Sequence, residues 1–137
     1  MTERKKLVSK LDKVFSLYIR GRDKRCVLCG KREDLNCGHL LTRNAYSTRW
    51  DEQNCACVCT GCNLRHENDA SHHTLWYIKK YGLTSYEALV LMHHTTRKFK
   101  NDELQALILE YTNKVKALEG MSDSERHERM AKKYGVK

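Results

Sequence analysis

The chain has 137 residues, and its 26 Lys and Arg outnumber 17 Asp and Glu to give a formal charge of +9. This length suits one modest core, which a metal could reinforce, and is short for two independent domains. The charge favours a polyanionic partner, above all nucleic acid, over a neutral one. No apolar run approaches the ~20 residues that span a bilayer, and the start MTERKK lacks the apolar stretch of a secretory signal. We therefore expect no membrane association and a cytoplasmic location.

Residues 5–22 form the first element that the sequence predicts. Apolar side chains recur there at three- and four-residue steps, and charged residues fill the positions between them. This pattern is typical of an amphipathic helix with one face toward a core and a solvated, mostly basic face opposite.

Residues 23–72 contain all seven cysteines, and four of them form two CxxC pairs about thirty residues apart. Two such pairs supply the four thiolates of a tetrahedral structural zinc site. Seven cysteines without a secretion signal also fit a metal or reduced thiols better than disulfides. The sequence therefore predicts one structural zinc per chain, held by Cys26, Cys29, Cys59 and Cys62.

The other three cysteines, Cys37, Cys55 and Cys57, are more simply explained as small buried hydrophobic residues, although any of them could replace a zinc ligand. Cys55, Cys57 and Cys59 alternate along the chain, as in an extended strand with these three on one face. A zinc that joins the two CxxC pairs would pin residues 30–58 as a hairpin.

Residues 73–120 show helical periodicity again, in three segments. Thr84 or Ser85 can cap the second segment and Asn101 the third, while Gly82 and Gly120 are natural stops. Residues 121–137 have few large apolar side chains, which predicts a solvated helix or a charged tail. We predict a single domain over residues 1–120: helix 5–22, metal-binding core 23–72 and helical cap 73–120.

His39, Asn54 and Asn63 follow one another between and just after the CxxC pairs. This order resembles the HNH, or ββα-metal, nuclease motif. The resemblance is closer still to the phage NinG/Rap recombination nucleases, and phage endonuclease VII has a similar layout. The runs that carry this resemblance are LDKVFSLYIRGRD, GHLLTR, TRWDEQN and CTGCN, and the similarity extends over roughly residues 11–82.

The resemblance implies a role for each of these residues. His39 would be the general base, since an imidazole titrates near neutral pH. Asn54 would orient the hairpin loop or the His39 ring, and the amide oxygen of Asn63 would bind a catalytic Mg²⁺ or Mn²⁺. Arg43 and Arg49 would clamp phosphate, although Arg49 could instead form a salt bridge with Asp51.

One position departs from the pattern of many HNH nucleases. They carry a metal ligand directly before the general base, where this chain has Gly38. His66, one helical turn after Asn63, is the best substitute, and an imidazole ligand would favour Mn²⁺ over Mg²⁺. His72 and His73 are more simply surface or packing residues, although the segment HENDASHH could line the site.

Together these observations predict an α+β fold: a zinc-stapled ββα-metal (HNH) core with an N-terminal amphipathic helix and C-terminal helices. The resemblance implies a metal-dependent DNA endonuclease that acts on branched recombination intermediates, Holliday junctions or D-loops. Such an enzyme would act as a homodimer, in the host cytoplasm if it is encoded by a phage or prophage. An HNH enzyme that nicks duplex DNA in phage packaging is one alternative. A non-catalytic, zinc-stabilised nucleic-acid-binding module is another.

Overall fold

The structure is a computed structural model of the chain, and it describes residues 1–120. The predicted tail 121–137 lies outside the described residues. The described residues form two compact units: residues 1–22 with residues 99–120, and Asp23–Lys98. The single domain predicted for residues 1–120 remains a prediction.

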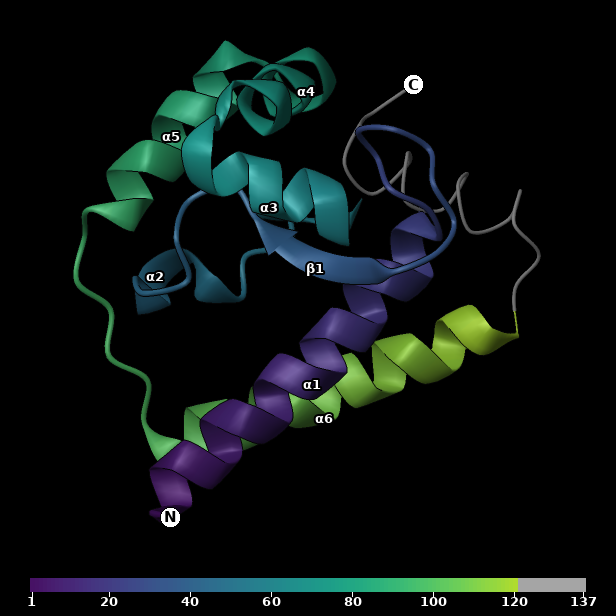
Figure 1. Cartoon of the computed structure of the whole chain (residues 1–137). Helices are drawn as coiled ribbons and strands as arrows, with labels where there is room; N and C mark the ends of the chain where they lie inside the picture. Colours follow the sequence, from purple (N-terminus) through teal and green to yellow (C-terminus); the bar gives the residue numbers. More distant parts are fainter. Residues whose placement is uncertain (121–137) are drawn as a thin grey trace. The chain divides into compact units, whose positions relative to one another are not determined.

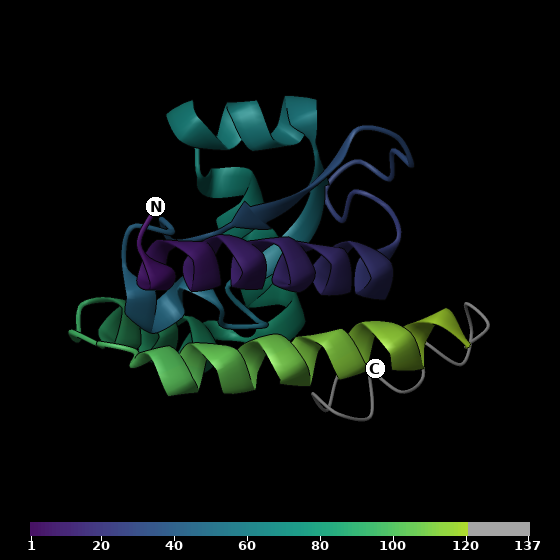
Figure 2. The ribbon, with the colours of Figure 1, turned by 90° about the horizontal axis from the view of Figure 1, so that it is seen from below.

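The first unit is built on two long helices, α1 (Glu3–Asp23) and α6 (Asn101–Glu119). They run side by side in the same direction (Figure 2), with Arg4 donating to the Phe99 carbonyl at one end and Gly21 beside Leu118 at the other. The predicted amphipathic helix 5–22 is therefore present.

Aromatic rings join these two helices. The Phe15 ring meets the Tyr111 ring edge to face, with centroids 4.9 Å apart, and the Tyr18 ring lies 5.4 Å from the same partner. The Lys114 ammonium lies 4.8 Å from the centre of the Tyr111 ring. Aromatic contacts of this kind add to the free energy gained by burying apolar area.

The second unit contains a two-stranded antiparallel sheet and four helices (Figure 1). Strand β1 (Leu35–His39) pairs with β2 (Cys55–Cys59), so that Cys37 lies opposite Cys57 and His39 opposite Cys55. A short helix, α2 (Tyr46–Arg49), lies between the strands, and α3 (Thr60–Asn68) follows β2 directly and packs on both strands. The predicted α+β class is thus confirmed as helices with a small antiparallel sheet.

Helices α4 (Ser71–Tyr81) and α5 (Leu83–His93) complete the second unit. Leu40, Tyr77 and Leu89 form a small apolar core there, and α5 contacts both α2 and α4. Helix α4 ends at Gly82, whose φ of 94° favours glycine. Within residues 1–120 no helix is long and apolar enough to cross a membrane.

The helix starts differ from those that the sequence predicts. Helix α5 begins at Leu83, before Thr84 and Ser85, and Gly82 precedes it. Asn101 is the first helical residue of α6, so it does not cap that helix. Instead, the Lys100 amide donates to the Glu103 carboxylate at 3.0 Å. Glu103 therefore satisfies the first turn of α6, as in one half of a capping box.

Candidate functional site

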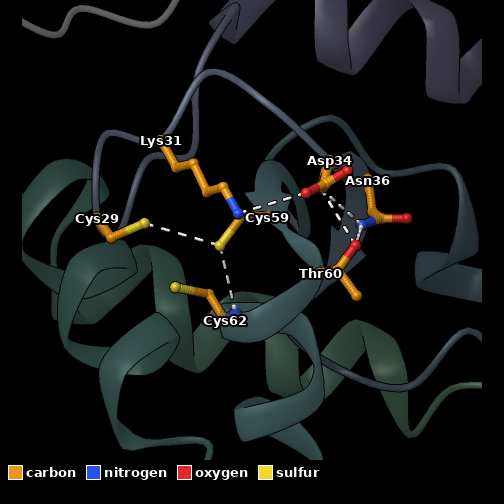
Figure 3. A network of polar contacts seen from close by, with 7 residues as sticks. All are labelled: Cys29, Lys31, Asp34, Asn36, Cys59, Thr60 and Cys62. Atoms are coloured by element: carbon orange, nitrogen blue, oxygen red, sulfur yellow. Dashed lines mark hydrogen bonds and ion pairs between the residues drawn. The ribbon is translucent and has the colours of Figure 1, made fainter.

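The four cysteines of the two CxxC pairs converge, with their sulfur atoms all within 4.8 Å of one another. The Sγ atoms of Cys29 and Cys59 lie 3.7 Å apart (Figure 3). Zinc–sulfur bonds of about 2.3 Å in a tetrahedron place two sulfurs roughly 3.8 Å apart. Cys26, Cys29, Cys59 and Cys62 can therefore hold one zinc ion, as the sequence predicts.

Backbone hydrogen bonds shape the first CxxC turn. The Gly30 amide donates to the Cys26 carbonyl at 2.8 Å, and the Cys26 amide donates to the Lys31 carbonyl at 2.8 Å. Gly30 has a φ of 83°, which a residue with a side chain rarely adopts. In the second turn, the Cys62 amide donates to the Cys59 sulfur at 3.4 Å. Each turn thus presents its two sulfurs on one side.

The thiols of this cluster differ in acidity. Burial opposes ionisation of Cys26, but backbone hydrogen bonds, led by that from Cys59, outweigh it and lower the Cys26 pKa to about 7. Burial and hydrogen bonds with neighbouring thiols raise the pKa of Cys62 to about 12. One thiol ionises readily beside another that resists ionisation, and a divalent cation would let all four become thiolates together.

A tight turn links the cluster of four CxxC cysteines to β1 (Figure 3). Asp34 has a φ of 54°, and its carbonyl accepts hydrogen bonds from the Thr60 amide at 2.9 Å and the Asn36 side chain at 3.2 Å. Its carboxylate lies 3.3 Å from the Lys31 ammonium. These contacts tie the start of the hairpin to the start of α3.

His39 stands at the end of β1, where its Nε2 lies 2.9 Å from the Arg49 carbonyl. A carbonyl oxygen only accepts, so Nε2 carries a proton, and in the neutral form of the ring Nδ1 carries the lone pair. The side chain is half-buried. His39 therefore does not belong to the cluster of four CxxC cysteines, and its ring is oriented by the Arg49 carbonyl.

Asn54 is fully buried and holds together the loop that supplies this carbonyl. Its Oδ1 accepts from the Leu41 amide at 2.8 Å, while its Nδ2 donates to the carbonyls of Leu41 at 3.1 Å and Thr48 at 3.0 Å. Asp51 accepts from the Asn54 amide at 3.0 Å. All three hydrogen bonds of the amide side chain go to backbone, so Asn54 positions the loop.

Asn63 is a half-buried residue of α3 that lies against β1. A Cβ placed on Gly38 would lie 3.4 Å from the Asn63 Oδ1 and only 2.5 Å from the Val58 Cγ2. Position 38 therefore has no room for a ligand side chain, and the amide oxygen of Asn63 reaches the strand beside His39. This close approach explains why glycine stands at the position before the predicted base.

The two predicted phosphate clamps differ in their surroundings. Arg43 is exposed. The Arg49 guanidinium lies 5.3 Å from the centre of the Tyr46 ring and 5.6 Å from that of Trp50, and it donates to the Arg43 carbonyl at 3.2 Å. The Asp51 carboxylate accepts from the backbone amides of Gln53 and Asn54. Arg49 thus contributes its carbonyl to the site, and its side chain stacks on aromatic rings.

His66 lies on α3, and its Nε2 is 2.9 Å from the carbonyl oxygen of Leu40. Leu40 is the residue that follows His39 in the chain. Its ring is 5.3 Å from that of His73, centroid to centroid. His73 is buried, and burial, reinforced by the nearby His66 and His39, lowers its pKa to about 4. His73 therefore does not lie on the surface, and the segment 66–73 brings a second histidine beside the predicted ligand.

A further group of possible ligands escaped the sequence reasoning. The side chains of Cys37, His39 and Cys55 place their ligand atoms within 4.8 Å of one another. Cys37 is half-buried and Cys55 is buried, which agrees with the packing role predicted for them. Only the register that sets His39 opposite Cys55 reveals this proximity.

The comparisons with known proteins identify a family. A family model described as Bacteriophage Lambda NinG protein matches residues 1–121. No curated protein and no solved structure matches the chain. The family match spans both units, including the CxxC pairs, the hairpin and helix α6. The chain therefore belongs to the bacteriophage lambda NinG family.

Proposed function

We propose that this protein is a metal-dependent DNA endonuclease of the HNH type that acts on branched recombination intermediates. The observation that carries the proposal is the hydrogen bond between His39 Nε2 and the Arg49 carbonyl, 2.9 Å long. It selects the tautomer in which Nδ1 can take a proton from water. The family resemblance and the charge of +9 agree with a nucleic-acid substrate.

The reaction is hydrolysis of one phosphodiester bond. His39 Nδ1 accepts a proton from water as the water oxygen bonds to phosphorus, the bond from phosphorus to the 3′ oxygen breaks, and the 3′ oxygen takes up a proton from a solvent water. The products carry a 3′-hydroxyl and a 5′-phosphate. Asn54 keeps the Arg49 carbonyl in place, so the His39 ring is oriented before substrate arrives.

The residues around His39 also fit a divalent ion. Asn63 offers an amide oxygen, a hard ligand, where α3 meets β1. A bound Mg²⁺ or Mn²⁺ would supply positive charge that stabilises the phosphate and the leaving oxygen. The exposed Arg43 is available to hold substrate phosphate near this end of the hairpin.

Two symmetric incisions resolve a four-way junction, and a homodimer would supply them. Exposed leucines on the long helices support this part of the proposal, since Leu17 of α1 is 50% exposed and Leu109 of α6 is 63% exposed. Such side chains are available for a second copy of the chain.

The test is cleavage of a labelled four-way junction at low salt with Mg²⁺ or Mn²⁺. His39→Ala should lower the rate by about 100-fold or more, and Asn63→Ala should lower it comparably, while zinc content and helicity persist. His94→Ala removes an exposed imidazole in the same unit and should leave the rate unchanged. Cleavage that survives His39→Ala would overturn the catalytic assignment and favour a non-catalytic zinc-stabilised binding module.

Linear duplex of the same sequence, assayed in parallel, tests the substrate. Preference for the junction supports the recombination role. Equal rates on both substrates would favour the nicking enzyme that acts on duplex DNA in phage packaging.

A further inference from the structure

Two buried imidazole nitrogens have no hydrogen-bond partner within residues 1–120: Nδ1 of His66 and Nε2 of His73. His73 is only 2% exposed, so solvent does not satisfy its Nε2 atom. Buried polar atoms in folded proteins are nearly always paired, and those left unpaired call for a ligand or another explanation. Two of them on neighbouring rings point to a ligand that binds both.

The geometry of His66 is that of a metal ligand. Its Nε2 lies 2.9 Å from the Leu40 carbonyl and must donate to it, which leaves the lone pair on the unpartnered Nδ1. Histidines that bind metals usually donate their other ring N–H to a carbonyl or carboxylate in this way, because that bond fixes the tautomer and the ring orientation.

The spacing of the two rings agrees with a shared ion. Metal–nitrogen bonds of about 2.1 Å at a tetrahedral angle place two imidazole centres roughly 5 Å apart, and the His66 and His73 centroids are 5.3 Å apart. Asp69 accepts hydrogen bonds from the amide and the hydroxyl of Ser71, at 3.0 and 2.6 Å, which orders the start of α4 just before His73. The centroid of the Trp76 ring lies 5.8 Å from that of His73, and both residues belong to α4.

We propose that His66 Nδ1 and His73 Nε2 bind one divalent transition-metal ion, and that this pair supplies the ligands that Gly38 cannot. His66 lies one helical turn after Asn63, on the same face of α3. The Leu40 carbonyl that orients His66 belongs to the residue after His39. Imidazole ligands favour Mn²⁺, Co²⁺ or Zn²⁺ over Mg²⁺. The binding itself stands on the two histidines, while its part in catalysis rests on the proposed nuclease function.

Mn²⁺ binding to the full chain, loaded with one zinc, tests this without any activity measurement. Electron paramagnetic resonance of free Mn²⁺ should reveal one site per chain in the wild type. His66→Gln and His73→Gln should each weaken binding by about 10- to 100-fold. His72→Gln is the matched control, because His72 is the exposed neighbour of His73 and should leave the affinity within about twofold.

Ring-proton NMR of the wild type supplies a second measurement in case a variant unfolds. Substoichiometric Mn²⁺ should broaden the His66 and His73 ring signals before that of His72. Equal broadening of all three signals, or unchanged Mn²⁺ affinity in both folded variants, would overturn the proposal. Cleavage that survives His39→Ala would instead overturn the nuclease function and leave the Mn²⁺ result standing.

Discussion

The two units of this chain are stabilised by different means. In the first, α1 and α6 lie side by side and are joined by apolar and aromatic side chains such as Phe15 and Tyr111. In the second, a hairpin of two five-residue strands is held by four cysteines and by the buried amide of Asn54. A hairpin this small is marginal in water, so the cysteine cluster, which can hold zinc, and the Asn54 hydrogen bonds are expected to stabilise the unit that contains the candidate site.

The largest effect that this comparison predicts is that of removing the zinc. Chelation of zinc, or Cys62→Ser, should unfold residues 23–98, because structural zinc contributes directly to the folding free energy. Hydrogen exchange should show lost protection in β1, β2 and α3, with protection in α1 and α6 largely retained. Equal loss in both units would mean that they fold as one.

The converse change removes aromatic packing from the helix pair. The Phe15 side chain is only 1% exposed. Phe15→Ala should therefore lower the free energy of unfolding by about 4 kcal/mol. Helices α1 and α6 should lose protection from hydrogen exchange, while zinc content stays at one per chain. Leu17→Ala, at a position 50% exposed in the same helix, should cost less than about 1 kcal/mol. Loss of zinc in Phe15→Ala would contradict the separation.

Asn54→Ala should be the most damaging polar substitution in the hairpin unit. It deletes three hydrogen bonds and leaves the amide and the carbonyl of Leu41 without their Asn54 partner, at a cost of about 3 kcal/mol. Urea unfolding measures the loss, and the exposed Asn44→Ala is the control. A small effect would show that zinc alone holds the loop.

The pH dependence of the second unit should reflect His73. Its folded pKa of about 4 lies below the unfolded value of 6.5, so the unfolded chain takes up the proton first as pH falls. The contribution of His73 to the free energy of unfolding is complete above about pH 6.5 and decreases as the pH falls from 6.5 to 4. Below that range the loss amounts to about 3 kcal/mol.

Urea unfolding at pH 7.5, 6 and 5, without added Mn²⁺, measures this slope. His73→Gln should flatten it, whereas His72→Gln should leave it unchanged. Zinc content is followed at each pH, because the thiolates also take up protons in acid. A slope that persists in His73→Gln would assign the pH dependence to the zinc cluster.

Gly38→Ala should have the smallest effect of this series, about 2 kcal/mol, through the 2.5 Å clash with Val58. Val58→Ala in the same chain should recover part of the loss. Gly61→Ala is the control, since a Cβ there meets no atom within 4 Å. Full stability of Gly38→Ala would show that the strand can shift and that a ligand could be restored at position 38.

Sequence patterns predicted the parts of this molecule that rest on local rules. Three-to-four periodicity predicts α1, and CxxC spacing predicts the convergence of the four cysteines. Helix α2 has only four residues, too few for a periodic pattern, and it went unpredicted. The pairing of α6 with α1 was also out of reach, because periodicity identifies a buried face but does not say what covers it.

The candidate site divides in the same way. The order of His39, Asn54 and Asn63 was enough to single these residues out. The contact between His66 and His73 depends on how the chain turns between α3 and α4, so the sequence predicts a surface or packing role for His73 without its contact with His66. The hydrogen bond of His39 to a carbonyl leaves no trace in residue identities.

The hydrogen bond from His39 to the Arg49 carbonyl also predicts which substitutions can disturb the orientation of the His39 ring. No substitution removes a backbone oxygen. Replacing Arg49 should therefore leave the orientation of the His39 ring unchanged. The same orientation is vulnerable at a distance, at Asn54, whose amide fixes the Thr48 carbonyl directly before Arg49. A saturation screen for loss of the proposed nuclease activity should therefore find Asn54 intolerant and position 49 permissive, although Arg49 is the residue that contacts the proposed base.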